Sequence, residues 1–378
     1  MKRILLSLAH MGGTEIDYVN KAFETNWIVP LGPNVDEFER RLESFLHTDR
    51  PVVALSAGTA AIHMGLIMAG VKAGDEVVCQ SLTFSASANP IVYQGARPVF
   101  VDSESVTWNM DADILAEALE DRKRATGRYP RAVVPVHLYG MPADMDAICK
   151  VCDERGVAVV EDAAEALGSR YDGRFCGTLG LYGALSFNGN KIITTSGGGA
   201  LVCPDAESAG RVKFLSTQAR EPLPYYYHKE IGYNYRLSNV SAGIGCGQME
   251  VLDEHLERRR YNHRRYAEGL SDLAGVKVHD NPSDRYDSNF WLTTILIDPE
   301  ATGTTPDKVR MGLEEKNIES RLIWRPMHMQ PVFADAPYYG SNVGERIFET
   351  GLCLPSGSAL TDEDLDRVID ALRSILKH

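Results

Sequence analysis

The amino-acid sequence predicts an α/β protein in which a mostly parallel sheet, flanked by helices, precedes a smaller α+β part. Short, almost wholly apolar runs alternate with helical stretches through about the first 200 of the 378 residues, which is typical of parallel sheets covered on both faces. After Ser238 the pattern changes to a long helical stretch and then to a mixture of short strands and helices. We therefore expect a large domain at 1–240, and a connecting helix with a small domain at 241–378.

The expected strands of the large domain are short and end in polar or glycine-rich turns. They span 51–57, 76–80, 97–102, 132–138, 157–162, 184–188 and 200–203, with helices at 58–71, 111–124 and around Cys149. In the second part we expect a helical stretch from 238 to about 270, strands at 290–297 and 320–323, and helices at 306–316 and 361–376. Because ligands bind at the carboxyl ends of parallel strands, 56–59, Asp162 and 186–191 are expected along one rim.

The composition excludes several classes of protein. A net charge of −13 argues against nucleic acid or an anionic membrane as the main partner. No apolar run approaches the roughly 20 residues that span a bilayer, and the apolar stretch at 4–9 is too short for a signal peptide, so we expect a cytoplasmic protein. The seven cysteines are scattered, and the pair Cys149 and Cys152 falls in an expected helix. No disulfide framework and no metal site are therefore expected.

Lys191 is the first candidate for chemistry. It lies just past an apolar strand, between small polar residues, and before a run of apolar and glycine residues. A lysine in such a turn is expected to be partly buried, and burial lowers the pKa of an amine. A neutral amine attacks an aldehyde, and pyridoxal 5'-phosphate supplies one. Lys191 is thus predicted to hold this cofactor as a Schiff base.

Asp162 is the second candidate, because it ends a buried strand. A buried carboxylate is costly unless it is paired, and the protonated ring nitrogen of pyridoxal phosphate is a suitable partner. The alternative is that Asp162 only caps a following helix.

The segment 56–59 joins an expected strand to an expected helix. Free N–H groups at a helix N-terminus bind phosphate well, and Ser186 could add a hydroxyl group to the same phosphate. An ordinary helix cap is the alternative. Phe84 could stack on the cofactor ring, although a core position is the commoner use of a phenylalanine.

Two further patterns are interpreted structurally. The glycines at 243, 245 and 247 have the wrong spacing and context for a dinucleotide loop, so they indicate close helix packing. The arginines at 258–260 and 264–265 indicate a solvated helix face.

Together these residues resemble the DegT/DnrJ/EryC1/StrS family of sugar aminotransferases. Thr59 with Ala60, Phe84, the segment 161–164, Ser186 with Lys191, and the segment 232–237 fall in the family's order, and the resemblance extends from 10–13 to 354–356. It implies the aspartate-aminotransferase-like fold, called fold type I, pyridoxal 5'-phosphate as cofactor, and an obligate homodimer whose active sites lie at the subunit interface.

The resemblance also implies roles for individual residues. Gly58, Thr59, Ala60 and Ser186 would bind the cofactor phosphate, Asn234 would reach the phosphate of the partner subunit, Phe84 would cover the ring, and His328, Trp27 and Arg236 would contact substrate. For His328 a purely structural role is the alternative.

Glu165 departs from the commoner family pattern, which has His or Gln three residues after the aspartate. An ionised carboxylate would not suit a contact with the phenolate oxygen of the cofactor, so Glu165 would be protonated, turned toward substrate or bridged by water. A Glu at this position resembles a narrower subgroup, as do the segments 27–33, 186–191 and 216–220.

That subgroup acts on UDP-linked 4-keto-6-deoxy-N-acetylhexosamines for bacillosamine-type bacterial glycans. The resemblance thus implies amino transfer from L-glutamate to the C4 ketone of such a sugar. The alternatives are a GDP-linked 4-keto sugar, a dTDP-linked 3-keto or 4-keto sugar, and a non-catalytic regulatory protein that binds the same cofactor. Lys191 argues against the dehydratases of this scaffold, which have histidine there. A Rossmann dehydrogenase lacks support, because no G-x-G-x-x-G motif follows the first strand.

Overall fold

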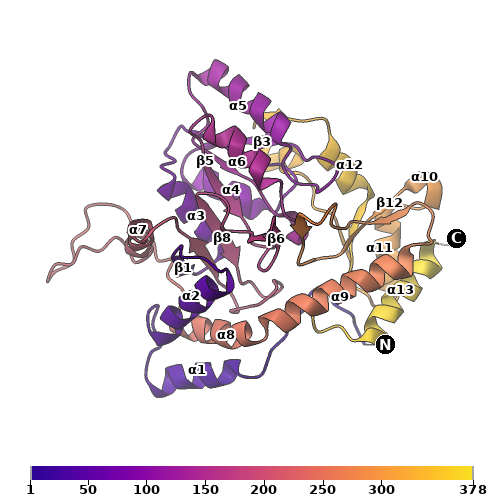
Figure 1. The fold of residues 1–378 in the computed structure, drawn as a ribbon, viewed down its shortest axis with the longest axis horizontal. Helices are drawn as coiled ribbons and strands as arrows, with labels where there is room; N and C mark the ends of the chain where they lie inside the picture. The colour runs from indigo at the N-terminus through magenta and orange to yellow at the C-terminus, as the bar shows by residue number, and fades with distance from the viewer. Residues whose placement is uncertain (1, 377–378) are drawn as a thin grey trace.

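The computed structural model describes residues 2–376 and is built around an eight-stranded sheet (Figure 1). In spatial order the strands are β1 (Val52–Leu55), β9 (Gly199–Val202), β8 (Tyr182–Ser186), β5 (Ala158–Asp162), β4 (Ala132–Val134), β2 (Glu76–Gln80), β3 (Arg97–Val101) and β14 (Tyr338–Tyr339). Only β9 runs against the others in this sheet. The predicted parallel sheet is confirmed, and its strands are almost entirely buried because helices cover both faces.

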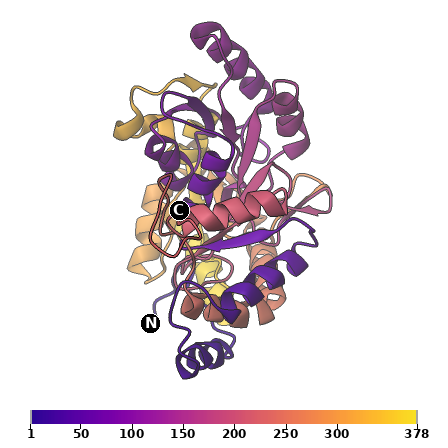
Figure 2. The same ribbon diagram turned by 90° about the vertical axis from the view of Figure 1, so that its left-hand side faces the viewer.

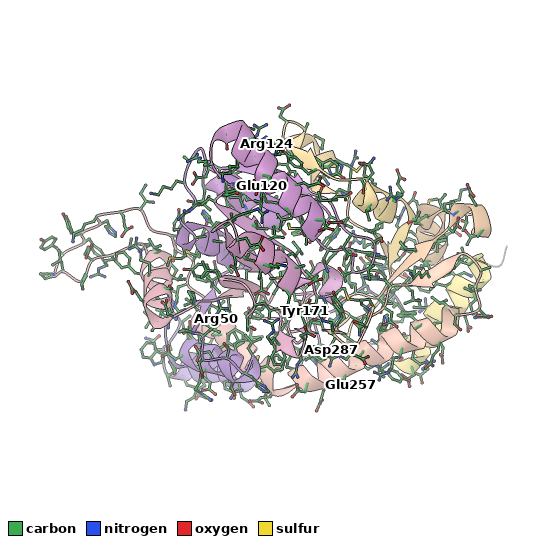
Figure 3. All side chains as sticks on the ribbon, turned by 45° about the horizontal axis from the view of Figure 1, so that its top comes forward. Arg50, Glu120, Arg124, Tyr171, Glu257 and Asp287 are labelled. Atoms are coloured by element: carbon green, nitrogen blue, oxygen red, sulfur yellow. The ribbon has the colours of Figure 1, made fainter. Side chains whose placement is uncertain are left out.

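The helices of the large sheet form two layers. One face is covered by α3 (Gly58–Met68), α4 (Ser85–Tyr93) and α7 (Ala206–Ser216), and the other by α2 (Pro33–Phe45), α5 (Ala112–Thr126) and α6 (Met145–Asp153). Glu120 and Arg124, which are labelled in Figure 3, lie on α5. The predicted helix at Cys149 and Cys152 is α6, and both thiols are free.

The smaller part has its own sheet, in the order β10 (Val276–Val278), β12 (Thr294–Ile297), β15 (Gly351–Cys353), β13 (Arg321–Leu322). Its helices are α10 (Pro299–Thr302), α11 (Pro306–Glu315), α12 (Val343–Thr350) and α13 (Asp362–Leu376), with 3-10 turns at η2 (Met327–Met329) and η3 (Pro331–Phe333). A three-stranded sheet of β6 (Arg170–Tyr171), β7 (Arg174–Phe175) and β11 (Tyr286–Asp287), and a 3-10 turn η1 (Leu138–Gly140), complete the fold.

The structure differs in detail from the elements predicted from the sequence. The expected single helix after Ser238 is two helices, α8 (Asn239–Glu250) and α9 (Leu252–Leu270), because Val251 leaves helical geometry. The strand expected at 290–297 begins only at Thr294. Other helices were not predicted, namely α1 (Glu15–Glu24), α2, α4, α7, α10 and α12. Helix α1 packs on α8 and lies at the lower edge of the molecule in Figures 1 and 2.

The predicted division into domains at 1–240 and 241–378 stays a prediction. Two segments pack with the part on the other side of this boundary. Ile4 forms a β-bridge with Ile318 and belongs to the core of the smaller part. Strand β14 joins the edge of the large sheet beside β3. No helix within residues 2–376 combines the length and apolarity needed to cross a bilayer.

The glycines of α8 allow the close helix packing that the sequence indicated. A Cβ atom on Gly247 would lie 2.7 Å from the backbone nitrogen of Glu15 in α1, and a Cβ atom on Gly245 would lie 2.7 Å from the ring of Phe38 in α2. Close approach of three helices therefore depends on the missing side chains.

We expect Gly247→Ala to lower the free energy of unfolding by about 1–3 kcal/mol, because the neighbouring atoms belong to backbone and cannot move aside. Gly210→Ala in α7 is the matched control, since open space surrounds its Cβ position and alanine favours a helix by roughly 0.5–1 kcal/mol. Thermal and denaturant unfolding of both variants measure the difference. Equal stability of the two variants would contradict close packing at Gly247.

Candidate active site

A cavity of about 330 Å³ opens at the carboxyl ends of β1, β5 and β8, where the smaller part closes over the large sheet. It is lined by Ser56, Ala57, Gly58, Thr59, Ile62, Phe84, Ala86, Asp162, Ala164, Glu165, Ser186, Asn188, Asn190, Lys191, Gly197, Gly198, Trp291 and Trp324. Seven of the residues singled out from the sequence are among them: Gly58, Thr59, Phe84, Asp162, Glu165, Ser186 and Lys191.

Lys191 lies in the loop between β8 and the antiparallel strand β9. A turn in which its backbone N–H donates to Asn188 O (2.9 Å) points the side chain into the cavity. Only 13% of the side chain is exposed, and Nζ lies 3.5 Å from Glu165 Oε1 and 4.0 Å from the centre of the Trp291 ring. The primary amine is therefore sheltered from bulk water and held between an acid and an aromatic face.

Glu165 is buried beside this amine. Its Oε2 accepts a hydrogen bond from the backbone N–H of Tyr139 (2.6 Å). Burial raises the pKa of Glu165 to about 7, and the charge of Asp162 adds to this, although Lys191 and the Tyr139 N–H oppose it. Near neutral pH this carboxyl group can either hold or release a proton.

Asp162 ends β5 and is almost completely buried. Its Oδ2 accepts a hydrogen bond from Ser87 Oγ (2.6 Å), and its Oδ1 accepts one from the backbone N–H of Ala164 (3.1 Å). The hydroxyl group of Thr83 lies 2.7 Å from that of Ser87 and extends the chain of hydrogen bonds. No helix follows Asp162, so a role as helix cap does not account for it.

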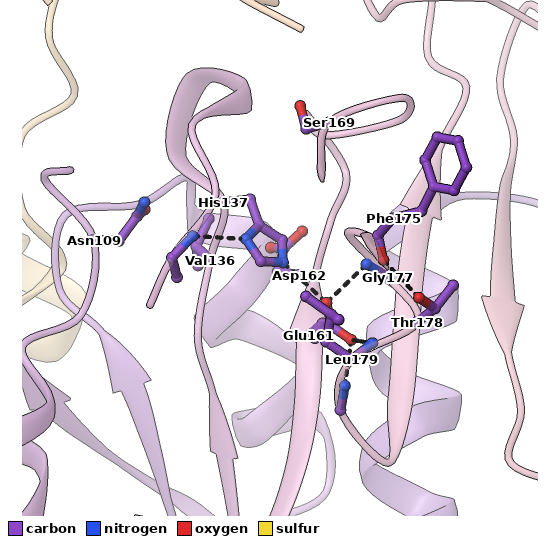
Figure 4. Close-up of polar contacts among 12 residues, drawn as sticks. Asn109, Val136, His137, Glu161, Asp162, Ser169, Phe175, Gly177, Thr178 and Leu179 are labelled. Carbon is purple, nitrogen blue, oxygen red and sulfur yellow. Dashed lines mark hydrogen bonds and ion pairs between the residues drawn. The ribbon is translucent and has the colours of Figure 1, made fainter. Parts of the chain in front are cut away.

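Glu161, one residue earlier on β5, is the centre of a buried hydrogen-bond network next to the site (Figure 4). Its carboxylate accepts hydrogen bonds from His137 Nε2 (3.0 Å) and from the backbone N–H groups of Gly177, Leu179 and Gly180. The other ring nitrogen of His137 accepts from Ala143 N–H (3.0 Å). Burial favours the neutral acid, but these donors hold the pKa of Glu161 below its usual value. This network fixes the end of β5 and hence the position of Asp162.

The opposite end of the cavity is formed by the N-terminus of α3. The helix begins at Gly58 without a side-chain cap, so its first N–H groups are free to bind an anion. A Cβ atom on Gly58 would lie 2.8 Å from Ser186 Cβ, which shows how closely the turn approaches β8. Ala60 is buried in α3 and does not line the cavity, although its N–H belongs to the first helical turn.

Aromatic side chains form the walls. Phe84 is half exposed rather than buried in the core, and its ring lies 5.4 Å from that of Trp324. A second cavity, of about 510 Å³, shares Phe84, Asn190, Trp291 and Trp324 with the first and is also lined by Arg321 and Arg325.

Arg236 and His328, two predicted substrate residues, line neither cavity, so their contact with substrate stays a prediction. The side chain of Arg236 is largely buried, and its Nη1 forms an ion pair with Glu39 and donates to Ala54 O (2.9 Å). The ring nitrogens of His328 contact Ser81 Oγ (2.7 Å) and Glu345 Oε1 (3.1 Å), which is compatible with the purely structural alternative.

Trp27 and Asn234 also lie outside the cavity of their own chain. Trp27 is 39% exposed in the turn between α1 and α2, and Asn234 is exposed in the long segment after α7. That segment extends away from the body of the molecule in Figure 1. Asn234 is thus available to a neighbouring molecule but not to the cavity of its own chain.

The comparison with known proteins identifies the chain. The DegT/DnrJ/EryC1/StrS aminotransferase family model matches residues 9–373. The chain belongs to that family.

Individual relatives cover almost the whole chain. EpsN of Bacillus subtilis (strain 168), whose name describes it as a pyridoxal phosphate-dependent aminotransferase, is 49% identical over 98% of this chain and 95% of its own. The GDP-perosamine synthase of Caulobacter vibrioides is 37% identical over 100% of this chain and 99% of its own. The crystal structure of DesI with its TDP-sugar product superposes with a TM-score of 0.89 at 31% identity, over 100% of this chain and 94% of DesI.

The DegT-family chain is thus a pyridoxal phosphate-dependent sugar aminotransferase with fold type I. The cavity has a suitable partner for each of three groups of the cofactor. The uncapped start of α3 suits a phosphate, Asp162 suits a protonated ring nitrogen, and Lys191 Nζ suits the aldehyde. Within residues 2–376, no cluster of three or more His, Cys, Asp and Glu side chains could hold a metal ion.

Several residues of the site had no recognisable signal in the sequence. Trp291 and Trp324 come from the smaller part and reach the cavity only through the tertiary fold. Ser87 gave no sign of its bond to Asp162. The motif S-L-T-F-S around Phe84 at least placed Ser87 close to a predicted site residue.

Proposed function

We propose that the protein transfers the amino group of L-glutamate to the C4 ketone of a UDP-linked 4-keto-6-deoxy-N-acetylhexosamine, giving 2-oxoglutarate and the 4-amino sugar. The observation that carries the proposal is the convergence of Lys191 Nζ, the Asp162 carboxylate and the free N-terminus of α3 on one cavity. We further propose that the enzyme is a cytoplasmic homodimer, with Asn234 reaching the site of the partner subunit.

The proposed roles follow from the chemistry of each group. When bound, pyridoxal phosphate supplies an aldehyde and an electron-withdrawing ring that stabilises negative charge next to the transferred nitrogen. Lys191 Nζ holds the cofactor, removes the proton from Cα of glutamate, and delivers a proton to C4 of the sugar in the second half-reaction. Asp162 keeps a proton on the ring nitrogen, and Trp291, Phe84 and Trp324 exclude water.

Glu165 is proposed to act in its protonated form. The pKa is raised, so the carboxyl group holds a proton below pH 7 and loses it above about that value. A protonated Glu165 can donate to the phenolate oxygen of the cofactor, whereas a carboxylate would repel it. We expect kcat/KM of the wild type to fall as the pH rises above about 7, by up to roughly tenfold per pH unit.

Glu165→Gln is expected to abolish this fall, because the amide donates a hydrogen bond at every pH. Glu257→Gln is the matched control, since Glu257 is exposed on the outer side of α9 (Figure 3). A Glu165→Gln enzyme that keeps the wild-type pH profile would exclude this role of Glu165.

Two features support the proposed nucleotide and sugar: a second cavity beside the first, and segments that resemble those of UDP-sugar enzymes. The second cavity has aromatic walls and is lined by Arg325 and by Arg321, which is ion-paired with Glu319; it offers room for a nucleoside diphosphate, with Arg325 as a cationic contact. The segments 27–33, 186–191 and 216–220 resemble those of enzymes that act on UDP-linked 4-keto sugars. The GDP-linked alternative is favoured by the perosamine synthase relative and the dTDP-linked one by DesI.

Product NMR decides among these substrates. The enzyme is incubated with L-glutamate and, in separate samples, UDP-, GDP- and dTDP-linked 4-keto and 3-keto sugars. The proposal expects a 4-amino product, matched by 2-oxoglutarate, at the highest kcat/KM with the UDP-linked N-acetyl sugar. A higher kcat/KM with a GDP- or dTDP-linked sugar would overturn the UDP assignment, and no amino sugar from any of them would overturn the activity.

A further inference from the structure

Arg259 is the largest fully buried side chain among the described residues, in a run of arginines that the sequence placed on a solvated face. It projects inward from α9, while Arg258 and Arg260 on either side are partly exposed. Burial alone lowers the pKa of Arg259 to about 9. Within residues 2–376 it forms no ion pair with a carboxylate, so its charge is compensated only by neutral acceptors.

The four acceptors come from four separate segments. Nη1 donates to Trp291 O (2.7 Å) and Ser356 O (3.3 Å), and Nη2 donates to Ser7 Oγ (3.0 Å) and Lys191 O (3.2 Å). One guanidinium group thus connects the N-terminal segment, the Lys191 loop and two loops of the smaller part.

Two of the residues that Arg259 contacts, Ser7 and Trp291, also share a hydrogen-bond acceptor in Asn190, the residue before Lys191. Asn190 O accepts hydrogen bonds from Ser7 Oγ (2.8 Å) and from Trp291 Nε1 (2.7 Å). The ring of Trp291 in turn lies 4.0 Å from Lys191 Nζ. Arg259 therefore restrains both the backbone that carries the amine and the aromatic face on which the amine rests.

We propose that Arg259 is a positioning residue, which holds Lys191 and Trp291 in the geometry needed for the amine to form and exchange its bond with the cofactor. The proposal rests on the role proposed above for Lys191. Stability alone is a poor reason for an unpaired buried charge, because apolar side chains of similar volume often replace buried ions without loss of stability. The bond in question is a carbon–nitrogen double bond that forms between Nζ and the cofactor aldehyde with release of one water.

The test compares Arg259→Met, Arg259→Lys and the neighbouring control Arg258→Met, each loaded with pyridoxal phosphate. Borohydride reduces the double bond to a stable amine, and mass spectrometry then gives the fraction of chains labelled at Lys191. We expect Arg259→Met to lower this fraction and kcat at least about tenfold while KM changes less than about threefold, corresponding to the loss of more than one charged hydrogen bond. Arg259→Lys should recover part of both, and Arg258→Met should match the wild type.

A second variant covers the case in which Arg259→Met does not fold. Ser7→Ala removes only the hydroxyl group that connects Arg259 to Asn190 O, and we expect a smaller loss of labelling and kcat in the same direction. Wild-type labelling and kcat in Arg259→Met, or in Ser7→Ala where the first variant is unfolded, would overturn the role of Arg259. Absence of label at Lys191 in the wild type would instead overturn the proposed role of the lysine.

Discussion

Replacing Lys191 with alanine is expected to abolish steady turnover, with kcat lower by at least about 10⁴-fold, because one amine is lost both as the attachment point and as the proton carrier. The sheltered position of Nζ, between Glu165 and Trp291, means that no neighbouring side chain can replace it. Release of 2-oxoglutarate under steady-state conditions measures kcat, and borohydride labelling measures attachment of the cofactor.

The control for this variant is Lys150→Ala, because Lys150 is exposed on α6 and remote from the cavity. It should retain wild-type turnover and labelling at Lys191. A Lys191→Ala enzyme that cycles at a rate near that of the wild type would exclude the lysine from the chemistry.

The rim of the sheet could be predicted because its signals are local. Each apolar run is long enough for one buried strand, and parallel strands bring their carboxyl ends to the same edge. Asp162, Ser186 and Gly58 follow such runs directly, so the sequence brought them together before any tertiary contact was known.

The walls of the site could not be predicted in the same way. Trp291 and Trp324 lie more than 90 residues beyond Lys191 in the chain, and no periodicity connects them to it. Their position depends on how the smaller part docks against the large sheet, which is set by packing along α9 and the N-terminal segment rather than by a local pattern.

Arg259 shows how a charge run can mislead. Five arginines within eight residues indicate a solvated surface, and the neighbours of Arg259 agree with that interpretation. The buried face of α9 is nevertheless marked by His255, Asn262 and Tyr266, which lie at helical spacing from Arg259. Leu252, Leu256 and Leu270 lie on the same buried face, but the polar residues between them interrupt the apolar pattern at Arg259.

The substrate roles expected of Arg236 and His328 stay predictions, because both side chains contact residues of their own chain. Both are polar residues in motifs that resemble those of the family, but Arg236 Nη1 and both ring nitrogens of His328 already have partners within their own chain. A side chain whose hydrogen-bonding groups are satisfied internally has little left to offer a substrate. The sequence shows which residues have hydrogen-bonding groups, but it does not show whether those groups are already bonded to other residues of the chain.

Asp162→Asn is expected to lower kcat by roughly two to three orders of magnitude while the cofactor remains bound through its phosphate. The amide keeps the shape of the side chain: its oxygen can still accept from Ala164 N–H, and its NH2 group can donate to Ser87 Oγ, so the main loss is the negative charge. Removing one partner of a buried ion pair typically costs about 3–5 kcal/mol, and each 1.4 kcal/mol of barrier is about tenfold in rate. Steady-state kinetics with glutamate give kcat, and the cofactor absorbance at each pH reports the protonation of the ring nitrogen.

Ser87→Ala separates charge from orientation. Its side chain only holds Asp162 Oδ2, so its loss should cost about 1.5–3 kcal/mol, or about tenfold to a hundredfold in kcat, with the ring nitrogen still protonated. In Asp162→Asn the ring nitrogen should instead lose its proton at a lower pH, because no carboxylate opposes its release. If both variants lost activity without any change in ring protonation, Asp162 would act by orientation alone, and the electrostatic role proposed for it would be wrong.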